Sequence, residues 1–238
     1  MALLALVFVG FYGRADVWEP LVWVLSAASM TIGNLVALRQ TNMVRLMAYS
    51  GVAQTGFMIA PLAVAGHSVA TGDQALSATV TYLVIYAAMN LGVFAVVITL
   101  ARRTGSAEIS SYAGAFHYAP GLTLAMTAFL FSLAGIPPLG GWFAKFEVFR
   151  VLATAGEPWG YALAVVAAVN SVIALFYYAT IARRMWADEA PDGDLSPVPV
   201  TPSLVSALAL CGIVTLVFGV APQAVARFTD VSLLALGG

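Results

Sequence analysis

The chain has 238 residues, of which 61% are hydrophobic and only 9% are charged, and its net charge is −1. A soluble domain carries about a quarter of charged residues, so this composition is typical of an integral membrane protein. The sequence has no basic stripe that would indicate nucleic acid as a partner. The single cysteine, Cys211, excludes an internal disulfide and a four-cysteine iron–sulfur site. The sequence also contains no glycine-rich nucleotide-binding motif.

The chain begins with an apolar segment, Met1–Tyr12, that stops at Gly13. This segment is too short to span a hydrocarbon core, which requires about 20 residues. It also lacks the basic start and the small-residue cleavage site of a signal peptide. We therefore expect residues 1–13 to be the remnant of a transmembrane helix whose first part is missing. An unusual signal or a surface-lying segment is the alternative.

Long runs without Asp, Glu, Lys or Arg follow one another along the rest of the chain. Each can supply one membrane-spanning helix, whereas the strands of a membrane barrel would show alternation. The runs are Pro20–Leu38, Leu46–Gly72, Gln74–Ala101, Ile109–Ala144, Pro158–Ala182 and Leu195–Ala226. The sequence predicts an all-α polytopic membrane protein with about six transmembrane helices, besides the N-terminal half-helix.

The stretch Leu122–Gly156 is too long for one straight crossing, because a helix over it would measure about 52 Å at roughly 1.5 Å per residue. Prolines and glycines interrupt it between Gly135 and Gly141. It therefore makes either two crossings or one crossing built from two half-helices. The residues that break the helix are Gly135, Pro137, Pro138, Gly140 and Gly141.

Arginines in the loops decide between these two arrangements. Pairs follow the first, third and fifth spans: Arg39 and Arg45, Arg102 and Arg103, and Arg183 and Arg184. All six lie on one side of the membrane only if Gly135–Gly141 interrupts a single crossing. The positive-inside rule therefore favours one broken helix and predicts that these loops are cytoplasmic.

Lys145 is the only lysine of the chain and follows Pro138 by about two helical turns. A lysine so far from a helix end is costly in a bilayer and should face protein or water. A break in a membrane helix exposes backbone groups that bind water or ions. Lys145 is therefore a candidate for loading and releasing a proton. The alternative is a lysine that reaches the interface or permanently neutralises a partner.

Other polar residues in the predicted spans could extend a hydrated path, although most such residues simply form hydrogen bonds between packed helices. The candidates for a relay or for water binding are Ser50, Gln54, Tyr86 and Asn90. Further polar positions are Ser29, Thr31, Asn34, Thr55, Asn170 and Ser171. Glu147 and Arg150 are three residues apart on one predicted helix, and we expect them to form a local ion pair.

Four segments resemble one family of membrane proteins. The segment "GIPPLGGWFAKF" (Gly135–Phe146) is similar to the broken-helix motif of the antiporter-like subunits of complex I. The other three resemble subunit N of bacterial NADH–quinone oxidoreductase. They are "NLVALRQTNMVRLMAYSGVAQTGF" (Asn34–Phe57), "YLVIYAAMNLGVFAVV" (Tyr82–Val97) and "NSVIALFYY" (Asn170–Tyr178). The related Mrp cation/proton antiporter subunits share the GIPP break and much of "RLMAYS".

The resemblance implies a fold of about fourteen helices with two inverted five-helix repeats, each containing one broken helix. Residues 14–186 would form the second repeat, and residues 187–238 a loop and the last helix. The lysine after the break is a proton-pathway residue in this family, a role that maps onto Lys145. Its partners, a glutamate and lysines of the first repeat, have no counterparts in this sequence. The chain alone is therefore not expected to pump.

The resemblance further implies a membrane-arm subunit in the bacterial inner membrane, with other membrane-arm subunits and the lipid bilayer as partners. NADH, flavin, iron–sulfur clusters and quinone are expected on partner subunits, and no cofactor or metal is expected on this chain. At Gln54 the family often carries histidine; glutamine cannot titrate and would only hold water. Two alternatives remain, namely an Mrp-type antiporter subunit and an inactive truncated membrane protein.

Overall fold

The computed structural model of the protein describes residues 12–191 and 193–221. Within these ranges the chain is helical, and its one isolated β-bridge joins Asn42 and Glu108. The described part begins with a 3₁₀ turn, η1, at Tyr12–Arg14. The predicted helix remnant at the N-terminus lies almost wholly outside the described residues.

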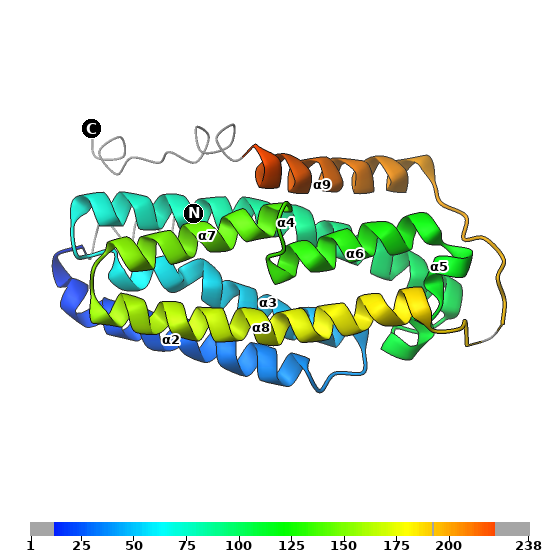
Figure 1. The fold of residues 1–238 in the computed structure, drawn as a ribbon, viewed down its shortest axis with the longest axis horizontal. Coiled ribbons are helices and arrows are strands. Elements are labelled where there is room, and N and C mark those ends of the chain that lie inside the picture. Colours follow the sequence, from blue (N-terminus) through cyan, green and yellow to red (C-terminus); the bar gives the residue numbers. More distant parts are fainter. Residues whose placement is uncertain (1–11, 192, 222–238) are drawn as a thin grey trace.

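Long helices form the body of the described molecule (Figure 1). They are α2 (Ala15–Ala37), α3 (Met43–Ile59), α4 (Val69–Thr104), α6 (Pro120–Ala134), α7 (Gly140–Thr154), α8 (Pro158–Ala187) and α9 (Pro202–Val220). Shorter turns are η2 (Ala60–Val64), η3 (Ile109–Tyr112) and α5 (Ala115–Tyr118). Five segments, α2, α3 with η2, α4, α8 and α9, are long and apolar enough to cross a membrane.

Local sequence explains where these helices start. The side chain of Asn42 accepts hydrogen bonds from the first amides of α3, and Ser68 and Thr201 do the same for α4 and α9. These are the residue types that favour the N-cap position. Helices α6, α8 and α9 begin with a proline, which fits the first turn because the amide it lacks would have no partner there.

Helices α6 and α7 together make one further crossing, the fourth in chain order, in addition to the five segments above. Each has 15 residues and measures about 22 Å, less than the roughly 30 Å of a hydrocarbon core. In Figure 1, α7 continues α6 in the same direction, and α8 then returns alongside. The prediction of one broken crossing between Gly135 and Gly141 is therefore confirmed, as is the all-α polytopic class.

The loops that carry the arginine pairs meet at one end of the molecule, which we call the arginine end. The amide of Met43 donates to the carbonyl of Ala107 (2.8 Å), and that of Ile109 donates to Thr41 (2.7 Å). These bonds tie the α2–α3 loop to the segment after α4. A further bond links the amide of Gly114 to the carbonyl of Arg184 at the end of α8 (3.1 Å). The structure therefore places all three loops on the same side.

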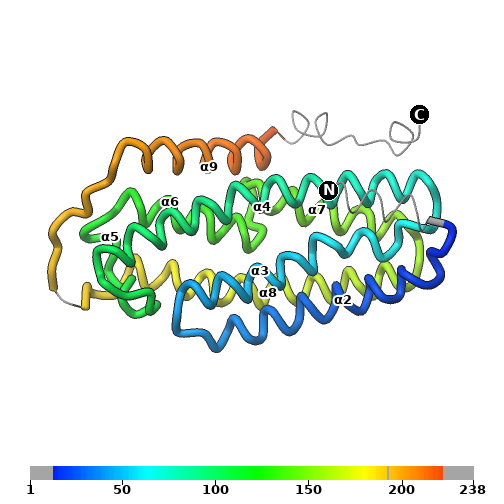
Figure 2. The backbone as a smooth tube through the Cα atoms, turned by 180° about the vertical axis from the view of Figure 1, so that it is seen from behind, coloured from blue at the N-terminus to red at the C-terminus, as the bar shows by residue number. Residues whose placement is uncertain are grey.

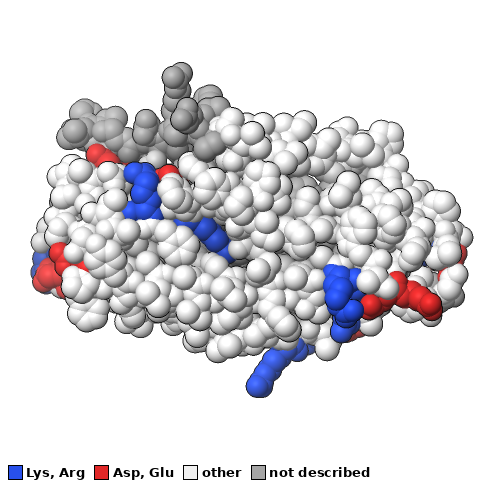
Figure 3. Space-filling model, in the orientation of Figure 1, with Lys and Arg blue, Asp and Glu red and all other residues white. Residues whose placement is uncertain are grey.

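The outer helices differ in how much of their surface they bury. Figures 1 and 2 show α2 and α9 on opposite sides of the bundle. Helix α2 packs on α3 and α8, whereas α9 packs on α4 and on both halves of the broken helix. In Figure 3 most of the visible face is free of charged side chains, with groups of charge near the two ends and one further cluster on the α7 side. This distribution suits a protein surrounded by lipid or other apolar partners.

Candidate functional site at the helix break

The link between α6 and α7 leaves the helical path over Gly135–Leu139. Gly135 has a φ of +96°, in the left-handed region that favours glycine. Its amide donates to the carbonyl of Phe131 (3.1 Å), which closes the end of α6. Pro137 and Pro138 are joined by a cis peptide bond, and neither has an amide hydrogen to donate. The break is therefore formed by these residue types themselves.

Two carbonyls at the end of α6 accept hydrogen bonds from side chains of other helices. The amide nitrogen of Gln54 donates to the carbonyl of Leu133 (3.1 Å). The Lys145 ammonium donates to the carbonyl of Ala134, the last residue of α6 (2.9 Å). Helix-end carbonyls carry partial negative charge and attract cations. Lys145 thus reaches back from α7 to the end of α6.

The first turn of α7 lies against α6 at a distance that only glycine permits. A Cβ on Gly141 would lie 1.7 Å from the carbonyl oxygen of Ser132. The amide of Gly141 donates to the Ser132 hydroxyl oxygen (3.0 Å), and this hydroxyl in turn contacts the Met89 sulfur (2.7 Å). Several amides of the break therefore have partners within the protein, as burial in a membrane requires.

Lys145 is 5% exposed and has neutral oxygen acceptors. Besides the Ala134 carbonyl, its Nζ donates to the Ser171 hydroxyl of α8 (3.2 Å) and lies 4.6 Å from the centre of the Phe57 ring. Its stem passes Gly135, where a Cβ would lie 2.9 Å from Lys145 Cδ. No carboxylate of the described residues forms an ion pair with it. The ammonium is therefore held by dipoles and an aromatic ring rather than by a counter-charge.

One buried chain of hydrogen bonds, which we call the glutamine cluster, begins at Gln54 of α3. The Gln54 side-chain oxygen accepts from the Tyr82 hydroxyl, and its nitrogen reaches the Tyr178 hydroxyl (3.4 Å) as well as the Leu133 carbonyl. The Tyr178 hydroxyl also pairs with the Ser50 hydroxyl. Only the pair of hydroxyls, Ser50 and Tyr178, can exchange donor and acceptor, because the Gln54 nitrogen only donates and its oxygen only accepts.

A second buried group, the asparagine cluster, joins α2 and α8. The Asn34 nitrogen donates to the side-chain oxygen of Asn170 (3.0 Å), and the Asn170 nitrogen donates to Thr31 (3.2 Å). The Tyr177 hydroxyl donates to the Asn34 side-chain oxygen (3.0 Å). Asn170 directly precedes Ser171, which accepts from Lys145. Through Asn170 the cluster thus adjoins Ser171 along α8, and the bonds of the cluster also pack α2 against α8.

A cavity of about 240 Å³ lies at the arginine end and reaches Tyr177. Its polar lining includes Gln40, Thr41, Glu108 and Arg184. Tyr177 thus borders the cavity, and its hydroxyl donates to Asn34 of the asparagine cluster. This arrangement connects the arginine end of the molecule to the asparagine cluster.

The structure brings together some of the residues singled out from the sequence and separates others. Ser50 and Gln54 share the glutamine cluster. The Tyr86 hydroxyl lies instead beside Gly51, where a Cβ would be 3.1 Å away. The buried side-chain oxygen of Asn90 has no hydrogen-bond partner among the described residues. Tyr86 and Asn90 therefore do not take part in the hydrogen bonds around Lys145.

Other charged groups form local pairs. Arg150 binds Glu147 at 2.6 Å on the exposed side of α7, as the sequence predicted. His67 lies 3.3 Å from Glu157 at the end opposite to the arginines. Within the described ranges no group of three or more His, Cys, Asp or Glu side chains could hold a metal ion.

Sequence reasoning missed Tyr82, Tyr178 and Phe57 as neighbours of the site, because buried aromatic residues are common in any helix bundle. Their position could have been inferred in part from spacing. Ser50, Gln54 and Phe57 recur at four and three residues, which places them on one face of α3. That face is the one directed at the break.

The chain belongs to the family of membrane proteins described as "NADH:quinone oxidoreductase/Mrp antiporter, TM", whose family model matches residues 1–171. The description names two kinds of membrane protein, NADH:quinone oxidoreductases and Mrp antiporters.

Several curated relatives are named NADH-quinone oxidoreductase subunit N. One, from Sorangium cellulosum, is 40% identical over 209 residues, covering 87% of this chain and 40% of the relative. Another, from Chloroflexus aggregans, is 37% identical over 238 residues, covering 100% of this chain and 47% of the relative. The chain thus spans less than half the length of these relatives.

Solved structures have the same fold. A chain of respiratory complex I from Thermus thermophilus matches with a TM-score of 0.67 and 27% identity, over 87% of this chain and 45% of that one. A chain of the Mrp complex from Dietzia matches with a TM-score of 0.79 and 22% identity, over 93% and 48%. At that lower identity the Mrp match shows the shared fold alone.

Proposed function

We propose that this chain is part of a proton-translocating membrane-arm subunit of a bacterial NADH–quinone oxidoreductase, and that Lys145 carries the proton. The observation that supports this most is the setting of Lys145, a buried ammonium held at a helix break by neutral oxygens. Identity of about 40% to proteins named subunit N supports the same assignment. As part of this subunit the chain is catalytic only within the whole oxidoreductase.

The chemistry follows from the acceptors of Lys145. A lysine without a carboxylate partner can lose its proton without leaving a buried anion uncompensated. The carbonyl of Ala134 and the hydroxyl of Ser171 stabilise the charged form, and the apolar surroundings favour the neutral one. A charge that crosses about 100 mV gains or loses roughly 2.3 kcal/mol. This energy is of the size of one or two hydrogen bonds, so modest rearrangements at the break can change the protonation of Lys145.

The proton's route uses the two clusters on either side of Lys145. The cavity at the arginine end, Tyr177 and the asparagine cluster form one approach, which ends at Ser171. The glutamine cluster forms the other, with Ser50 and Gln54 as relay or water-binding groups. Tyr86 and Asn90 serve as water-binding positions beyond the cluster, since the unpaired oxygen of Asn90 requires a donor.

We further propose how the chain is oriented in the membrane and which subunits surround it. The arginine end faces the cytoplasm of a bacterial inner membrane, in accordance with the positive-inside rule. Residues 14–186 form the second antiporter-like repeat, and other membrane-arm subunits cover its sides. NADH, flavin, iron–sulfur clusters and quinone are bound by partner subunits.

The first test is co-purification of the native protein from detergent-solubilised membranes. We expect the chain to migrate with NADH-dependent quinone reductase activity and with other membrane subunits. Migration with an activity driven by a sodium gradient and indifferent to NADH would instead indicate an Mrp-type antiporter. A free 24.8 kDa species without partners would indicate an inactive truncated protein.

The second test replaces Lys145 by methionine, which keeps the length of the side chain and removes its charge. In inverted membrane vesicles, NADH-driven proton uptake should fall at least about ten-fold, together with quinone reduction. Lys145→Arg should be partly tolerated, because the charge is kept but the guanidinium does not fit the same acceptors. Normal pumping by Lys145→Met, at normal protein level, would refute the role of Lys145.

A further inference from the structure

Helix α9 is the least buried of the described long helices, and its fully buried residues lie in one small patch. Of its residues only Thr215 and Gly219 are buried. They are four residues apart and therefore lie one above the other on the same face. Partly buried residues such as Leu208, Cys211 and Phe218 continue the contact with the bundle along the helix.

This patch lies directly against the break. A Cβ on Gly219 would lie 1.9 Å from the carbonyl oxygen of Pro138. One turn away along α9, the carbonyl oxygen of Thr215 lies 2.9 Å from the position of a Cβ on Gly140. The indole N–H of Trp142 donates to the carbonyl of Gly219 (3.4 Å). We call these contacts the α9 seat.

The contacts of the α9 seat are made with Pro138 and the first turn of α7, which precede Lys145. Trp142 is three residues before Lys145, so the two side chains are neighbours on the helix surface. The first turn of α7 is connected to α6 through two prolines, which supply no amide hydrogen bonds across the break. A helix lying on Pro138 and Trp142 therefore limits how far this turn can move.

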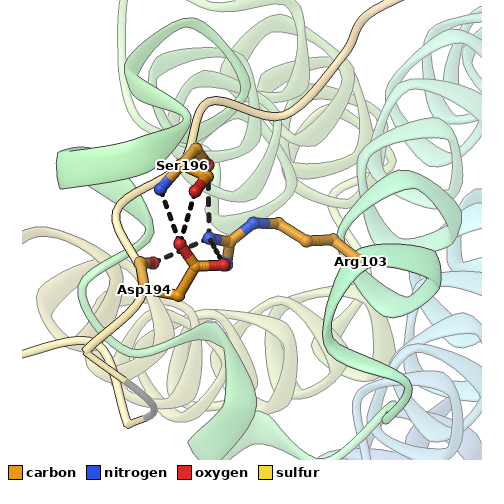
Figure 4. A network of polar contacts seen from close by, with 3 residues as sticks. All are labelled: Arg103, Asp194 and Ser196. Atoms are coloured by element: carbon orange, nitrogen blue, oxygen red, sulfur yellow. Dashed lines mark hydrogen bonds and ion pairs between the residues drawn. The ribbon is translucent and has the colours of Figure 1, made fainter.

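The segment that leads to α9 is itself fixed at the arginine end (Figure 4). Arg103 at the end of α4 donates to the carbonyls of Asp194 (2.7 Å) and Ser196 (3.2 Å) and lies 3.3 Å from the Asp194 carboxylate. Its guanidinium also covers the Tyr118 ring at 3.8 Å. Hydrogen bonds from the Ser196 hydroxyl and amide hold the pKa of Asp194 below its usual range. The carboxylate therefore stays ionised beside Arg103 at neutral pH.

We infer that α9 is a positioning helix for the proton site, in which Gly219 and Trp142 hold the first turn of α7 and thereby place Lys145 against Ala134 and Ser171. This inference rests on the proposed function for its consequence in pumping. Its structural part, the control of the position of residue 145, stands independently. Gly219 and Trp142 are accordingly positioning residues that act through Lys145.

The test measures the accessibility of position 145. Cys211 and any further cysteine of the full-length protein are replaced by serine, Lys145→Cys then provides the thiol, and its reaction with a membrane-permeant maleimide is timed in intact membranes. Adding Gly219→Val should raise the labelling rate at least about ten-fold, because valine cannot fit against the Pro138 carbonyl. Gly219→Ala places a single Cβ against the same carbonyl oxygen of Pro138, and it replaces Gly219→Val in the test if valine prevents membrane insertion.

The matched control is Gly212→Val on the same helix. Gly212 has no atom within 4 Å of an added Cβ, so labelling should match that of the parent. Trp142→Phe keeps an aromatic ring and removes the indole N–H. It should raise labelling about two- to ten-fold, which corresponds to the net value of one hydrogen bond.

The outcomes separate the two proposals. Labelling that is the same in Gly219→Val, Gly219→Ala and the parent would overturn the positioning role of α9, whatever happens to pumping. If labelling rises as expected while Lys145→Met pumps normally, the positioning role stands and the proton-carrying role of Lys145 falls. If both proposals hold, Gly219→Val on the Lys145 parent lowers NADH-driven proton uptake and Gly212→Val does not.

Discussion

Helix α7 carries two basic residues in opposite settings. Lys145 is buried and bonds to the Ala134 carbonyl and the Ser171 hydroxyl, whereas Arg150 is partly exposed and binds the Glu147 carboxylate through two nitrogens. A carboxylate partner keeps a base charged, and neutral acceptors leave its charge free to change. In the proposed function, the difference between the two bases is therefore the fixed counter-charge, which Arg150 has and Lys145 lacks among the described residues.

The sharpest way to break this contrast is to give Lys145 the partner that Arg150 has. Ser171→Asp places a carboxylate where the hydroxyl now accepts from Lys145. We expect the lysine to be locked in its charged form and NADH-driven proton uptake to fall at least about ten-fold. Ser171→Asn, which has nearly the same shape but no charge, is the control and should keep most of the activity. Equal activity of the two variants would contradict this interpretation of the site.

Gly135→Ala tests the space through which Lys145 reaches α6. An alanine at φ +96° is strained, and its Cβ would lie 2.9 Å from Lys145 Cδ. The strain costs about 1–3 kcal/mol, and we expect pumping to fall several-fold as the ammonium moves from Ala134. Gly156→Ala has similar strain, at φ +72°, with no atom within 4 Å. If the lysine contact matters, this control should lose stability in thermal unfolding but keep its pumping rate.

Gln54→Leu tests the glutamine cluster beside the break. The change leaves the Leu133 carbonyl and the Tyr82 hydroxyl without their partner, at about 1–3 kcal/mol for each buried group. We expect a lower temperature of thermal unfolding and a loss of pumping smaller than that of Ser171→Asp. Gln54→His introduces a titratable donor and should retain pumping. Full activity of Gln54→Leu would remove this cluster from the route.

We expect the smallest effect on pumping from removing the ion pair between Glu147 and Arg150. The double change Glu147→Gln and Arg150→Gln removes an ion pair whose arginine side chain is 41% exposed. Pairs of this kind contribute about 0–1 kcal/mol. Pumping in membrane vesicles should stay within about two-fold of the parent. A loss as large as that of Lys145→Met would mean that the two basic residues are not functionally different.

Much of the fold could be predicted because a membrane helix follows from composition and length. Uncharged runs located the crossings, and the loop arginines required one broken crossing between Gly135 and Gly141. The short elements η3 and α5 were not predicted, since they lie within the neutral run Ile109–Ala144 and have no charge pattern of their own. Their place depends on tertiary contacts such as the bond from Gly114 to Arg184.

The candidate site was harder to predict, because its members come from several helices whose rotation the sequence does not specify. Lys145 and the break are consecutive in the chain and could be found together. Tyr82 and Tyr86 are one helical turn apart on α4, and the structure places Tyr82, not Tyr86, within reach of Gln54. Depth along a helix is set by packing against its neighbours, and hydrophobic runs contain no information about it.

The bonds at the arginine end have a mechanical consequence. These bonds hold the segment that leads into α5 and α6, so the start of α6 is fixed to neighbouring helices. Helix α7 lies on the other side of the break and, among the described residues, has no such bonds from this segment. The far end of α7 turns through Ala155–Glu157 directly into α8, which returns to the arginine end. Because α7 continues directly into α8, we expect a swing of α7 at the break to shift Asn170 and Ser171 as well. The lysine and its acceptor would then move together, driven by a single hinge.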